Sequence, residues 1–260
     1  MKTIILCGGK GTRIRDVADD IPKPMIQLNG YPILWHIMKY YSAYNCNEFV
    51  LCLGYKGQTI KDFFLNYESN TRDMTIRLGK EKNIEYHNQH DEIEWSITLA
   101  ETGNDSLTGA RIKKVQKYLK DEDNFMLTYG DGLGDINIKE LVDFHLSHGK
   151  ILTVTGVRPP ARFGEIMCDD ANNITEFNEK PQAVEGRISG GFFVCRKEIF
   201  NYLGDNEDLI FEQEPIKMLV HDGEMKVFKH DGFWQPMDTL RDFSLLKNMC
   251  DNNTAPWMIW

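Results

Sequence analysis

Apolar and polar residues follow two patterns along the chain, and these patterns predict where strands and helices lie. Short, β-branched apolar runs indicate buried strands at 3–7, 48–53, 125–129 and 152–155. Apolar residues three and four positions apart indicate helices at 32–44, 57–67, 107–119 and 137–148. The stretch 73–100 is typical of extended pieces. Strands that alternate with helices predict an α/β fold with a mostly parallel, Rossmann-like sheet covered by helices.

The pattern changes near residue 158. Beyond it we expect short strands at 164–168, 173–178 and 190–195, helices near 197–203 and 212–222, a strand at 225–229 and a helix at 239–249. No internal repeat or flexible linker interrupts the chain. We therefore expect a single domain over 1–260, with a first half at about 1–157 and a smaller, mixed β half at about 158–260.

Composition narrows the class of protein. The 260 residues carry a formal net charge of −9 and are 42% hydrophobic, which favours a globular protein that does not bind nucleic acid. No apolar run is long enough to span a bilayer and no signal peptide is recognisable, so we expect no membrane partner. The 6 cysteines form no C-x-x-C pair. This favours buried free thiols, and a cytoplasmic location, over a zinc site or disulfides.

The junction after the first strand carries the strongest chemical signal. Residues 8–13 have the sequence GGKGTR. Three glycines in four positions let the backbone turn sharply and bring N–H groups close to a ligand, and the guanidinium of Arg13 suits phosphate. The pattern predicts a phosphate site at the carboxyl end of a strand. Its spacing matches neither the dinucleotide-binding fingerprint nor the P-loop.

Two aspartates and a lysine are further candidates. Asp131 lies between glycines just past the strand 125–129, where a carboxylate can hold Mg²⁺, although an Asp-Gly turn explains it equally well. Asp238 precedes the last helix, where a helix N-cap is the stronger alternative. Lys23 lies between two prolines that stiffen its loop, and an exposed lysine is usually only a solvated charge. No serine or histidine pattern indicates a hydrolase or zinc enzyme.

Together these motifs resemble the signature of the sugar-nucleotide pyrophosphorylases, a family of nucleotidyltransferases. The resemblance is carried by LCGGKGTR at 6–13, PKPM at 22–25 and EKP at 179–181. The chain also resembles the branch of the family that uses CTP. This narrower resemblance is carried by PILWHIM at 32–38, GYKG at 54–57, TYGDG at 128–132, GGFF at 190–193 and GFWQPMDTLRD at 232–242. The resemblance covers essentially the whole chain and implies a nucleotide half followed by a sugar-phosphate half.

The resemblance implies a role for each matching position. The nucleotide would be bound by Leu6, Cys7, Gly8, Gly9, Lys10, Gly11, Thr12, Arg13, Lys23, Ser106, Arg111 and Gly130. The sugar phosphate would be bound by Gly164, Glu179, Lys180 and Gly191. Mg²⁺ would be held by Asp131 and Asp238. The catalytic groups would be Arg13, Lys23, Asp131 and Lys180.

The implied reaction transfers CMP from CTP to glucose 1-phosphate and gives CDP-glucose and pyrophosphate, with Mg²⁺ as cofactor. The resemblance also implies a homo-oligomer, with a hexamer as one candidate, and a step in making deoxysugar precursors of bacterial surface polysaccharides. Two alternatives stay open: the same chemistry with another sugar phosphate or with UTP or dTTP, and a nucleotide-sensing subunit without turnover. The joint presence of Arg13, Lys23, Asp131, Lys180 and Asp238 disfavours the second.

The chain departs from the family pattern at a few positions. Cys7 replaces a small alanine, and we expect a buried residue rather than a nucleophile. The stretch 182–187 and Ser189, where Asn is expected, lie beside the sugar pocket, so the hexose stays open. Arg111 can only donate hydrogen bonds, so it should face the O2 carbonyl of the base. Because uracil shares O2, backbone carbonyls would have to read the cytosine amine. The aromatic end 255–260 is expected to dock, either in the core or at a subunit contact.

Overall fold

The structure, a computed structural model, describes residues 1–9, 21–79, 83–158, 165–168, 174–178 and 186–260. In that part of the chain the α-helices are α1 (Ile33–Ser42), α2 (Gly57–Leu65), α3 (Tyr67–Thr71), α4 (Thr108–Lys114), α5 (Ile138–His148), α6 (Glu214–His221) and α7 (Leu240–Asp251). The 3-10 helices are η2 (Lys23–Met25), η3 (Gln116–Tyr118) and η4 (Lys197–Tyr202). The strands are β1 (Thr3–Leu6), β2 (Gln27–Leu28), β3 (Tyr31–Pro32), β4 (Glu48–Leu53), β5 (Met74–Arg77), β6 (Asn83–Tyr86), β7 (Ser96–Glu101), β8 (Asn124–Tyr129), β9 (Gly132–Gly134), β10 (Leu152–Val157), β11 (Glu165–Cys168), β12 (Ile174–Asn178), β13 (Ile188–Arg196), β14 (Met225–His230) and β15 (Trp234–Pro236).

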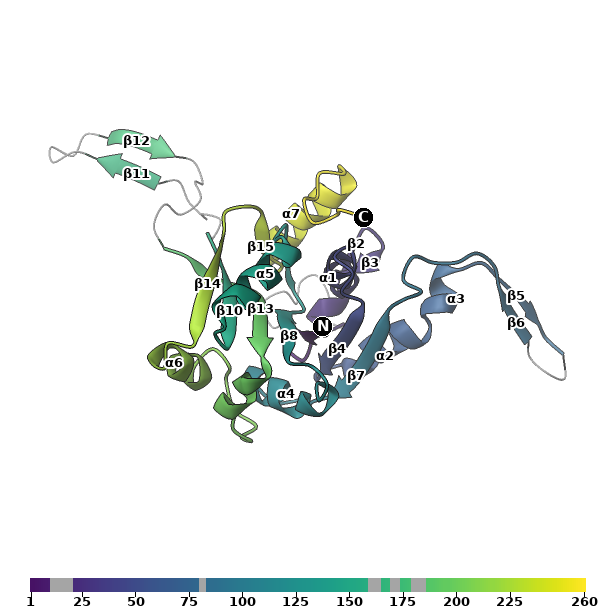
Figure 1. Cartoon of the computed structure of the whole chain (residues 1–260). Coiled ribbons are helices and arrows are strands. Elements are labelled where there is room, and N and C mark those ends of the chain that lie inside the picture. The colour runs from purple at the N-terminus through teal and green to yellow at the C-terminus, as the bar shows by residue number, and fades with distance from the viewer. Residues whose placement is uncertain (10–20, 80–82, 159–164, 169–173, 179–185) are drawn as a thin grey trace.

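The central sheet of the described residues has seven strands in the order β14-β10-β13-β8-β1-β4-β7 (Figure 1). β1 runs parallel to β8 and β4, and β4 runs parallel to β7. β13 is antiparallel to both of its neighbours, β8 and β10. The expectation of an α/β fold with a mostly parallel sheet is therefore confirmed. The carboxyl ends of β1 and β8 lie side by side, with Leu6 paired to Tyr129. This is the edge of the sheet at which the sequence predicts a phosphate site.

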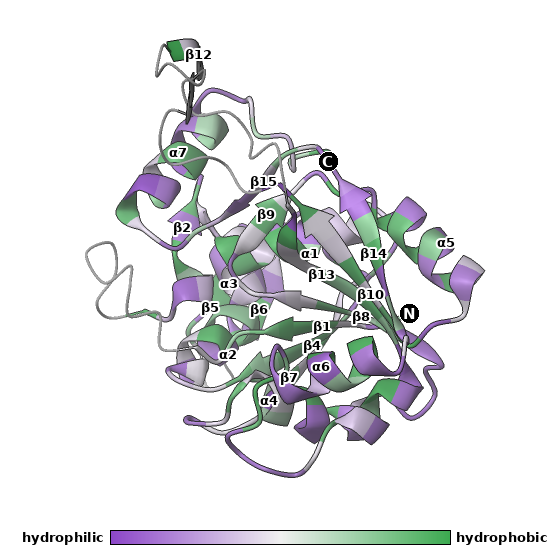
Figure 2. Ribbon diagram, turned by 90° about the vertical axis from the view of Figure 1, so that its left-hand side faces the viewer, coloured by the Kyte–Doolittle hydropathy of each residue, from purple (hydrophilic) through white to green (hydrophobic). Residues whose placement is uncertain are grey.

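Helices cover both faces of the sheet, and the sheet is the most apolar layer of the molecule (Figure 2). One core, which includes Ile37 of α1 and Leu141 of α5, lies on one face. The other core, which includes Ile112 of α4 and Leu219 of α6, lies on the opposite face. Because both faces are covered, the inner strands are buried along their length, and this explains their continuous apolar runs.

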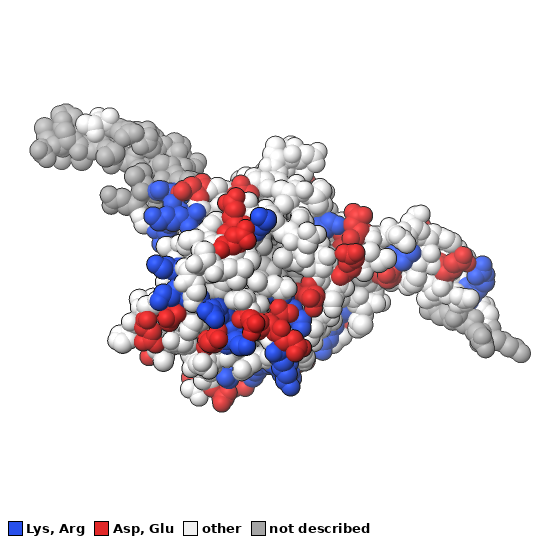
Figure 3. Space-filling view, viewed as in Figure 1, with Lys and Arg blue, Asp and Glu red and all other residues white. Residues whose placement is uncertain are grey.

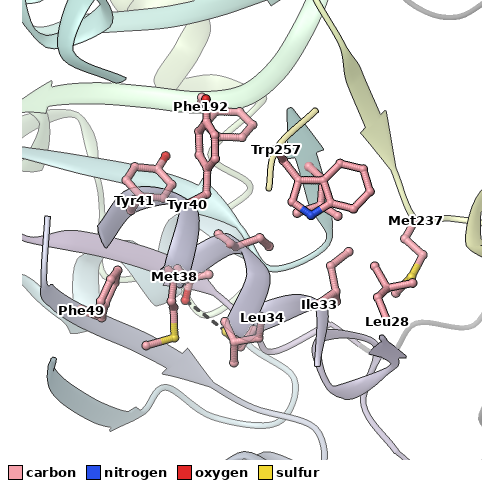
Figure 4. Close-up of a cluster of buried hydrophobic side chains, with 14 of the residues drawn as sticks. Leu28, Ile33, Leu34, Met38, Tyr40, Tyr41, Phe49, Phe192, Met237 and Trp257 are labelled. Atoms are coloured by element: carbon pink, nitrogen blue, oxygen red, sulfur yellow. Dashed lines mark hydrogen bonds between the residues drawn. The ribbon is translucent and has the colours of Figure 1, made fainter. Parts of the chain in front are cut away.

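The C-terminal residues pack into the first of these cores. The Trp257 side chain is fully buried and lies beside Ile33, Leu28 and Met237 (Figure 4). Its indole also stacks on Phe233, with ring centroids 5.6 Å apart. The expected docking of the aromatic end is confirmed at Trp257. The contact ties the chain end to Met237, which is the residue before Asp238.

The predicted elements are largely present, with informative differences at helix ends. The helix expected at 107–119 is α-helical only over α4 and then tightens, because Val115 bonds back to the carbonyl of Ile112. The segment expected as a helix at 197–203 is the 3-10 helix η4. The extended pieces of 73–100 are β5, β6 and β7, and β5 pairs with β6 in a hairpin that projects from the main body (Figure 1).

Candidate active site

A pocket of about 440 Å³ opens at the carboxyl ends of β1 and β8. It is lined by residues from the first strand, the loop around η2, the segment before and at the start of α4, the end of β8, and Asp238, which precedes the N-cap of α7. The lining residues are Leu6, Cys7, Gly8, Gly9, Lys23, Pro24, Asn104, Asp105, Ser106, Leu107, Thr108, Arg111, Tyr129, Gly130, Asp131 and Asp238. The structure thus brings together in one cavity the described residues predicted to bind nucleotide and metal.

The end of β8 is positioned by a close approach of three backbone segments. The Gly130 N–H donates to the carbonyl of Leu6 over 3.0 Å. A Cβ at Gly130 would lie 3.0 Å from that same oxygen and 3.2 Å from Cγ of Pro24. A side chain at position 130 would therefore push the η2 loop away from the strand ends. This loop carries Lys23, so the glycine sets how closely the lysine approaches the pocket floor.

Asp131 and Asp238 are brought together by a small sheet at the end of β8. Strand β9 pairs antiparallel with β15, with Gly132 opposite Pro236. The Met237 N–H then donates to the carbonyl of Asp131 over 2.9 Å. Thr239, not Asp238, caps α7: its hydroxyl accepts from the Asp242 N–H in a capping box. The alternative interpretation of Asp238 as the helix N-cap is therefore wrong.

Lys23 joins the two aspartates. Its Nζ lies 2.6 Å from Oδ2 of Asp131 and 2.5 Å from Oδ1 of Asp238. Oδ2 of Asp131 and Oδ1 of Asp238 can therefore be no farther apart than the sum of these distances, so both carboxylates lie around one point of the pocket. Burial acts to lower the pKa of Lys23, but attraction and hydrogen bonding to Asp131 and Asp238 outweigh it, so the net shift of the pKa is upward. The ammonium is held in its charged form.

These carboxylates fit a magnesium ion by their chemistry. Their side chains are 32% and 29% exposed, so they retain access to the pocket. Among the described residues no group of three or more His, Cys, Asp or Glu side chains could form a complete protein cage for a metal. Mg²⁺ commonly uses one or two carboxylates and takes its remaining ligands from water and substrate phosphates. Two aspartates that line the pocket are such a donor set.

Arg111 is buried under the first glycine turn. Its Nη2 donates to the carbonyl of Gly8 over 3.0 Å, and its Nη1 lies within 3.0 Å of Leu53 O, Thr102 Oγ1 and Gly103 O. A Cβ at Gly8 would lie 2.1 Å from Cζ of Arg111. Gly8 is therefore needed for the backbone to pass over the guanidinium. Arg111 binds the backbone around the pocket, while its predicted contact with the base O2 stays a prediction.

Ser106 is buried in the segment that precedes α4. Its hydroxyl lies 2.6 Å from the carbonyl of Thr102 and also contacts the carboxylate of Glu207, and it accepts from Nζ of Lys114 over 3.0 Å. Ser106 therefore lines the pocket, but its hydroxyl is engaged from behind. A direct bond from this hydroxyl to a base remains a prediction. Asn104, Asp105 and Thr108 of the same segment also line the pocket.

Cys7 behaves as expected of a small buried residue. It is 1% exposed, and burial, with smaller contributions from Cys52 and Asp131, raises the pKa of its thiol well above the ordinary value. A thiol that stays protonated is a poor nucleophile. Cys46, Cys52, Cys195 and Cys250 are also free thiols. The cysteines with described side chains thus fit the expectation of unpaired thiols.

Gly191 lies beside the pocket without lining it. Its backbone has φ +76°, and a Cβ there would lie 2.4 Å from Cδ2 of Tyr129. The glycine therefore lets the Tyr129 ring occupy its place on the pocket wall. The remaining predicted positions, namely Lys10, Gly11, Thr12, Arg13, Gly164, Glu179 and Lys180, lie outside the described residues.

Some residues that line the pocket stand out in the sequence only as parts of motifs, and the glutamates that hold them do not stand out at all. Tyr129 lines the pocket, and its hydroxyl donates to Glu212. Glu212 and Glu207 hold two hydroxyls of the segment before and at the start of α4. Nothing in the local sequence, DNED at 205–208 and FEQE at 211–214, distinguishes these two glutamates from ordinary solvated charges, so only the fold identifies them.

The described surface carries both signs of charge. On the face seen in Figure 3, basic and acidic side chains intermingle over α4 and α6. Within the described residues, no helix has the length and apolar character that crossing a membrane requires.

Comparison with known proteins identifies the family of the chain. Residues 2–249 match the model of the family described as nucleotidyl transferase. The chain is 44% identical to the glucose-1-phosphate cytidylyltransferase of Salmonella typhi and 43% identical to the probable glucose-1-phosphate cytidylyltransferase of Bacillus subtilis, in both cases over 100% of each chain. The crystal structure of HddC from Yersinia pseudotuberculosis is similar in fold, with a TM-score of 0.70, 22% identity and coverage of 97% of this chain and 99% of that one. The chain therefore belongs to the nucleotidyl transferase family, and it matches the cytidylyltransferase of Salmonella typhi and the probable one of Bacillus subtilis over their full length.

Proposed function

We propose that the protein is a glucose-1-phosphate cytidylyltransferase, which transfers CMP from CTP to glucose 1-phosphate and releases pyrophosphate. One observation carries the proposal. A chain 44% identical over its full length to such an enzyme places Lys23, Asp131 and Asp238 at one point of a pocket that the segment 104–108 also lines. The nucleotide half is 1–157 and the sugar-phosphate half is 158–260.

The reaction forms a bond from a phosphate oxygen of glucose 1-phosphate to the α-phosphorus of CTP, and the bond from that phosphorus to pyrophosphate breaks. A phosphate monoester is a nucleophile near neutral pH, so the protein needs no general base. Two polyanions must meet, so the pocket has to offset their repulsion. Lys23, Arg13 and Lys180 supply positive charge for this purpose, and positioning supplies most of the rest.

Asp131 and Asp238 would hold Mg²⁺, which supplies charge neutralisation of the phosphates when it is bound. Lys23 is fixed between two prolines in η2 and reaches the same carboxylates. Its ammonium can therefore act on the nucleotide phosphates at the place where the metal ligands converge. We assign Lys23 to the nucleotide side and Lys180, with Glu179, Gly164 and Gly191, to the sugar-phosphate side. The working form is a homo-oligomer, which light scattering of the purified protein tests.

Pyrophosphate release tests the function directly. The protein is assayed with Mg²⁺, glucose 1-phosphate and either CTP, UTP or dTTP, and then with CTP and a panel of sugar phosphates. We expect CTP and glucose 1-phosphate to give the highest kcat/KM. Faster turnover of UTP or dTTP would reject the cytidylyl assignment and leave the broader nucleotidyl transfer. Binding of nucleotide without any pyrophosphate release would instead indicate the nucleotide-sensing alternative.

A further inference from the structure

The base-binding side of the pocket is supported by a segment from the second half of the chain. Residues 205–212, between η4 and α6, lie against the start of α4. The carbonyl of Glu207 accepts from the Leu107 N–H over 2.9 Å, and the carbonyl of Leu209 accepts from the Gly109 N–H over 2.9 Å. Leu107 is the N-cap of α4 and makes no side-chain cap bond. The segment 205–212 therefore satisfies N–H groups that the helix leaves open.

This contact depends on a glycine in the helix. A Cβ at Gly109 would lie 2.7 Å from Cγ of Leu209 and 3.0 Å from the Leu209 carbonyl oxygen. Since Gly109 has no side chain, the two backbones approach closely enough to form the bond. The approach fixes the start of α4, and with it the residues that line the pocket immediately before it.

Residues 104–108 form the wall of the pocket that the nucleotide base is expected to contact. Two carboxylates of the segment 205–212 bind two hydroxyls of this wall. The Ser106 hydroxyl contacts the Glu207 carboxylate, which also accepts from Lys114 Nζ over 2.6 Å. The Thr108 hydroxyl donates to Oε2 of Glu212 over 2.6 Å and accepts from the Phe211 N–H over 2.9 Å. The hydroxyls of the wall are thus turned away from the pocket and toward the segment behind it.

Glu212 also reaches the pocket from a second direction. Its Oε1 accepts a hydrogen bond from the Tyr129 hydroxyl, and Tyr129 lines the same pocket as Thr108. One carboxylate therefore connects the base-binding wall to the end of β8, two residues before Asp131. A displacement of Glu212 would release both walls at once.

We propose that Glu207 and Glu212 are positioning residues that set the selectivity of the pocket for cytosine. The inference rests on the proposed function. The hydroxyls of Ser106 and Thr108 are engaged behind the wall, and the Nη groups of Arg111 are engaged by backbone carbonyls and the Thr102 hydroxyl. The backbone groups of 104–108 and the side chains of Asn104 and Asp105, which line the pocket, are left to read the base. Cytosine presents an amine donor where uracil presents a carbonyl acceptor, so a wall that holds its backbone in place can reject uracil.

The test compares nucleotide selectivity in variants of these two residues. Glu207→Ala, Glu212→Ala and the double variant are assayed for kcat/KM with CTP and with UTP, and for the KM of glucose 1-phosphate. Equilibrium binding of CTP and UTP is measured on the same proteins. Glu207→Gln keeps an acceptor for Ser106, and Asp205→Asn is the matched control, an exposed carboxylate of the same segment.

We expect the preference for CTP over UTP to fall about tenfold or more in the double variant, which corresponds to about 1.4 kcal/mol of lost discrimination. The KM for glucose 1-phosphate should stay within about twofold of the wild-type value. Glu207→Gln should recover most of the preference for CTP that Glu207→Ala loses. An unchanged ratio in both turnover and binding would overturn the inference, as would an equal loss for both nucleotides with lower thermal stability. If the wild-type protein does not turn over CTP, the proposed function fails, while the binding ratio still decides the role of these residues.

Discussion

Lys23 and Asp238 are separated by 215 positions in the chain, yet their side chains meet over 2.5 Å. The contact arises because β9 and β15 pair at the end of the central sheet and bring Asp238 close to the loop of η2. The Lys23 side chain is 11% exposed, and the carboxylate of Asp131 completes the arrangement from the other side. A largely buried cation between two carboxylates sets the charge at this point of the pocket.

Asp131→Asn should abolish magnesium-dependent turnover while leaving the protein folded. The variant removes a charged ligand from the proposed metal pair, but the amide oxygen can still accept from Lys23, and Asp238 stays in place. Pyrophosphate release across a Mg²⁺ series and a thermal melt check this. Asp121→Asn, an exposed carboxylate in the turn before β8, serves as control. Near wild-type turnover by Asp131→Asn would remove Asp131 from the mechanism.

Lys23→Ala and Lys180→Ala should affect different substrates. Each loses a charge-assisted contact of about 1.5–3 kcal/mol, or roughly ten- to a hundredfold in rate or affinity. Because Lys23 lies in the nucleotide pocket, its loss should raise the KM for CTP more than that for glucose 1-phosphate. Lys180→Ala should do the reverse. Initial-rate kinetics with each substrate varied in turn decides the matter, and equal effects on both substrates would contradict this division.

The sheet and its chemical edge could be predicted because their signals are local. An apolar run such as 3–7 indicates a buried strand, and a glycine turn after it indicates a ligand at the strand end. The pairing of Asp131 with Asp238 came only from the family resemblance, because nothing local to either residue points to the other. The structure supplies the reason in the β9–β15 sheet and the bond from Met237 to Asp131.

The supports of the pocket could not be predicted, since they act from far away in the sequence. Glu212 lies 83 positions from Tyr129 and 104 from Thr108. An exposed glutamate in a loop gives the same local pattern whether or not it holds a pocket wall. The engagement of Arg111 by backbone carbonyls was missed for the same reason. Donor capacity is visible in the residue type, but its partners depend on which strand ends converge.

Gly191→Ala should weaken the pocket wall through Tyr129. The substitution places a Cβ 2.4 Å from the Tyr129 ring at a φ of +76°, so both steric conflict and backbone strain oppose it. We expect a loss of about 1–3 kcal/mol in unfolding free energy and a higher KM for substrate. Urea unfolding and kinetics measure the two effects. Gly204→Ala is the control, because a Cβ there meets no atom within 4 Å. Equal stability of the two variants would show that Tyr129 moves aside without cost.

His145 should make the protein less stable as the pH falls. Its ring is buried, with Nδ1 2.8 Å from the Thr153 hydroxyl, and burial, followed by the charges of His148 and Arg196, lowers its pKa to about 4. The unfolded chain, with a His pKa near roughly 6.5, takes up the proton first. Stability from this group is therefore present above about pH 6.5 and is lost as the pH falls toward 4. Urea unfolding between these pH values should show a shallower pH dependence in His145→Gln, and an unchanged slope would contradict the assignment.

Arg111→Ala should weaken binding of all pyrimidine nucleotides without changing the preference among them. The guanidinium holds Gly8 on one side and Gly103 on the other, so its loss loosens the pocket as a whole. The carbonyls of Leu53, Gly8 and Gly103 would lose a buried donor, and we expect a fall of about 2–4 kcal/mol in unfolding free energy. Arg111→Lys keeps the charge but not the planar fork, so it should recover only part of this stability.

The same variant separates the role of Arg111 from that of the carboxylates behind the wall. O2, the base atom that Arg111 is predicted to face, is common to cytosine and uracil, so Arg111→Ala should raise the dissociation constants of CTP and UTP by the same factor. Glu207→Ala with Glu212→Ala should instead change their ratio. Isothermal titration of CTP and UTP on both proteins makes the comparison. A selective loss of CTP binding in Arg111→Ala would mean that the guanidinium itself reads the edge that distinguishes cytosine.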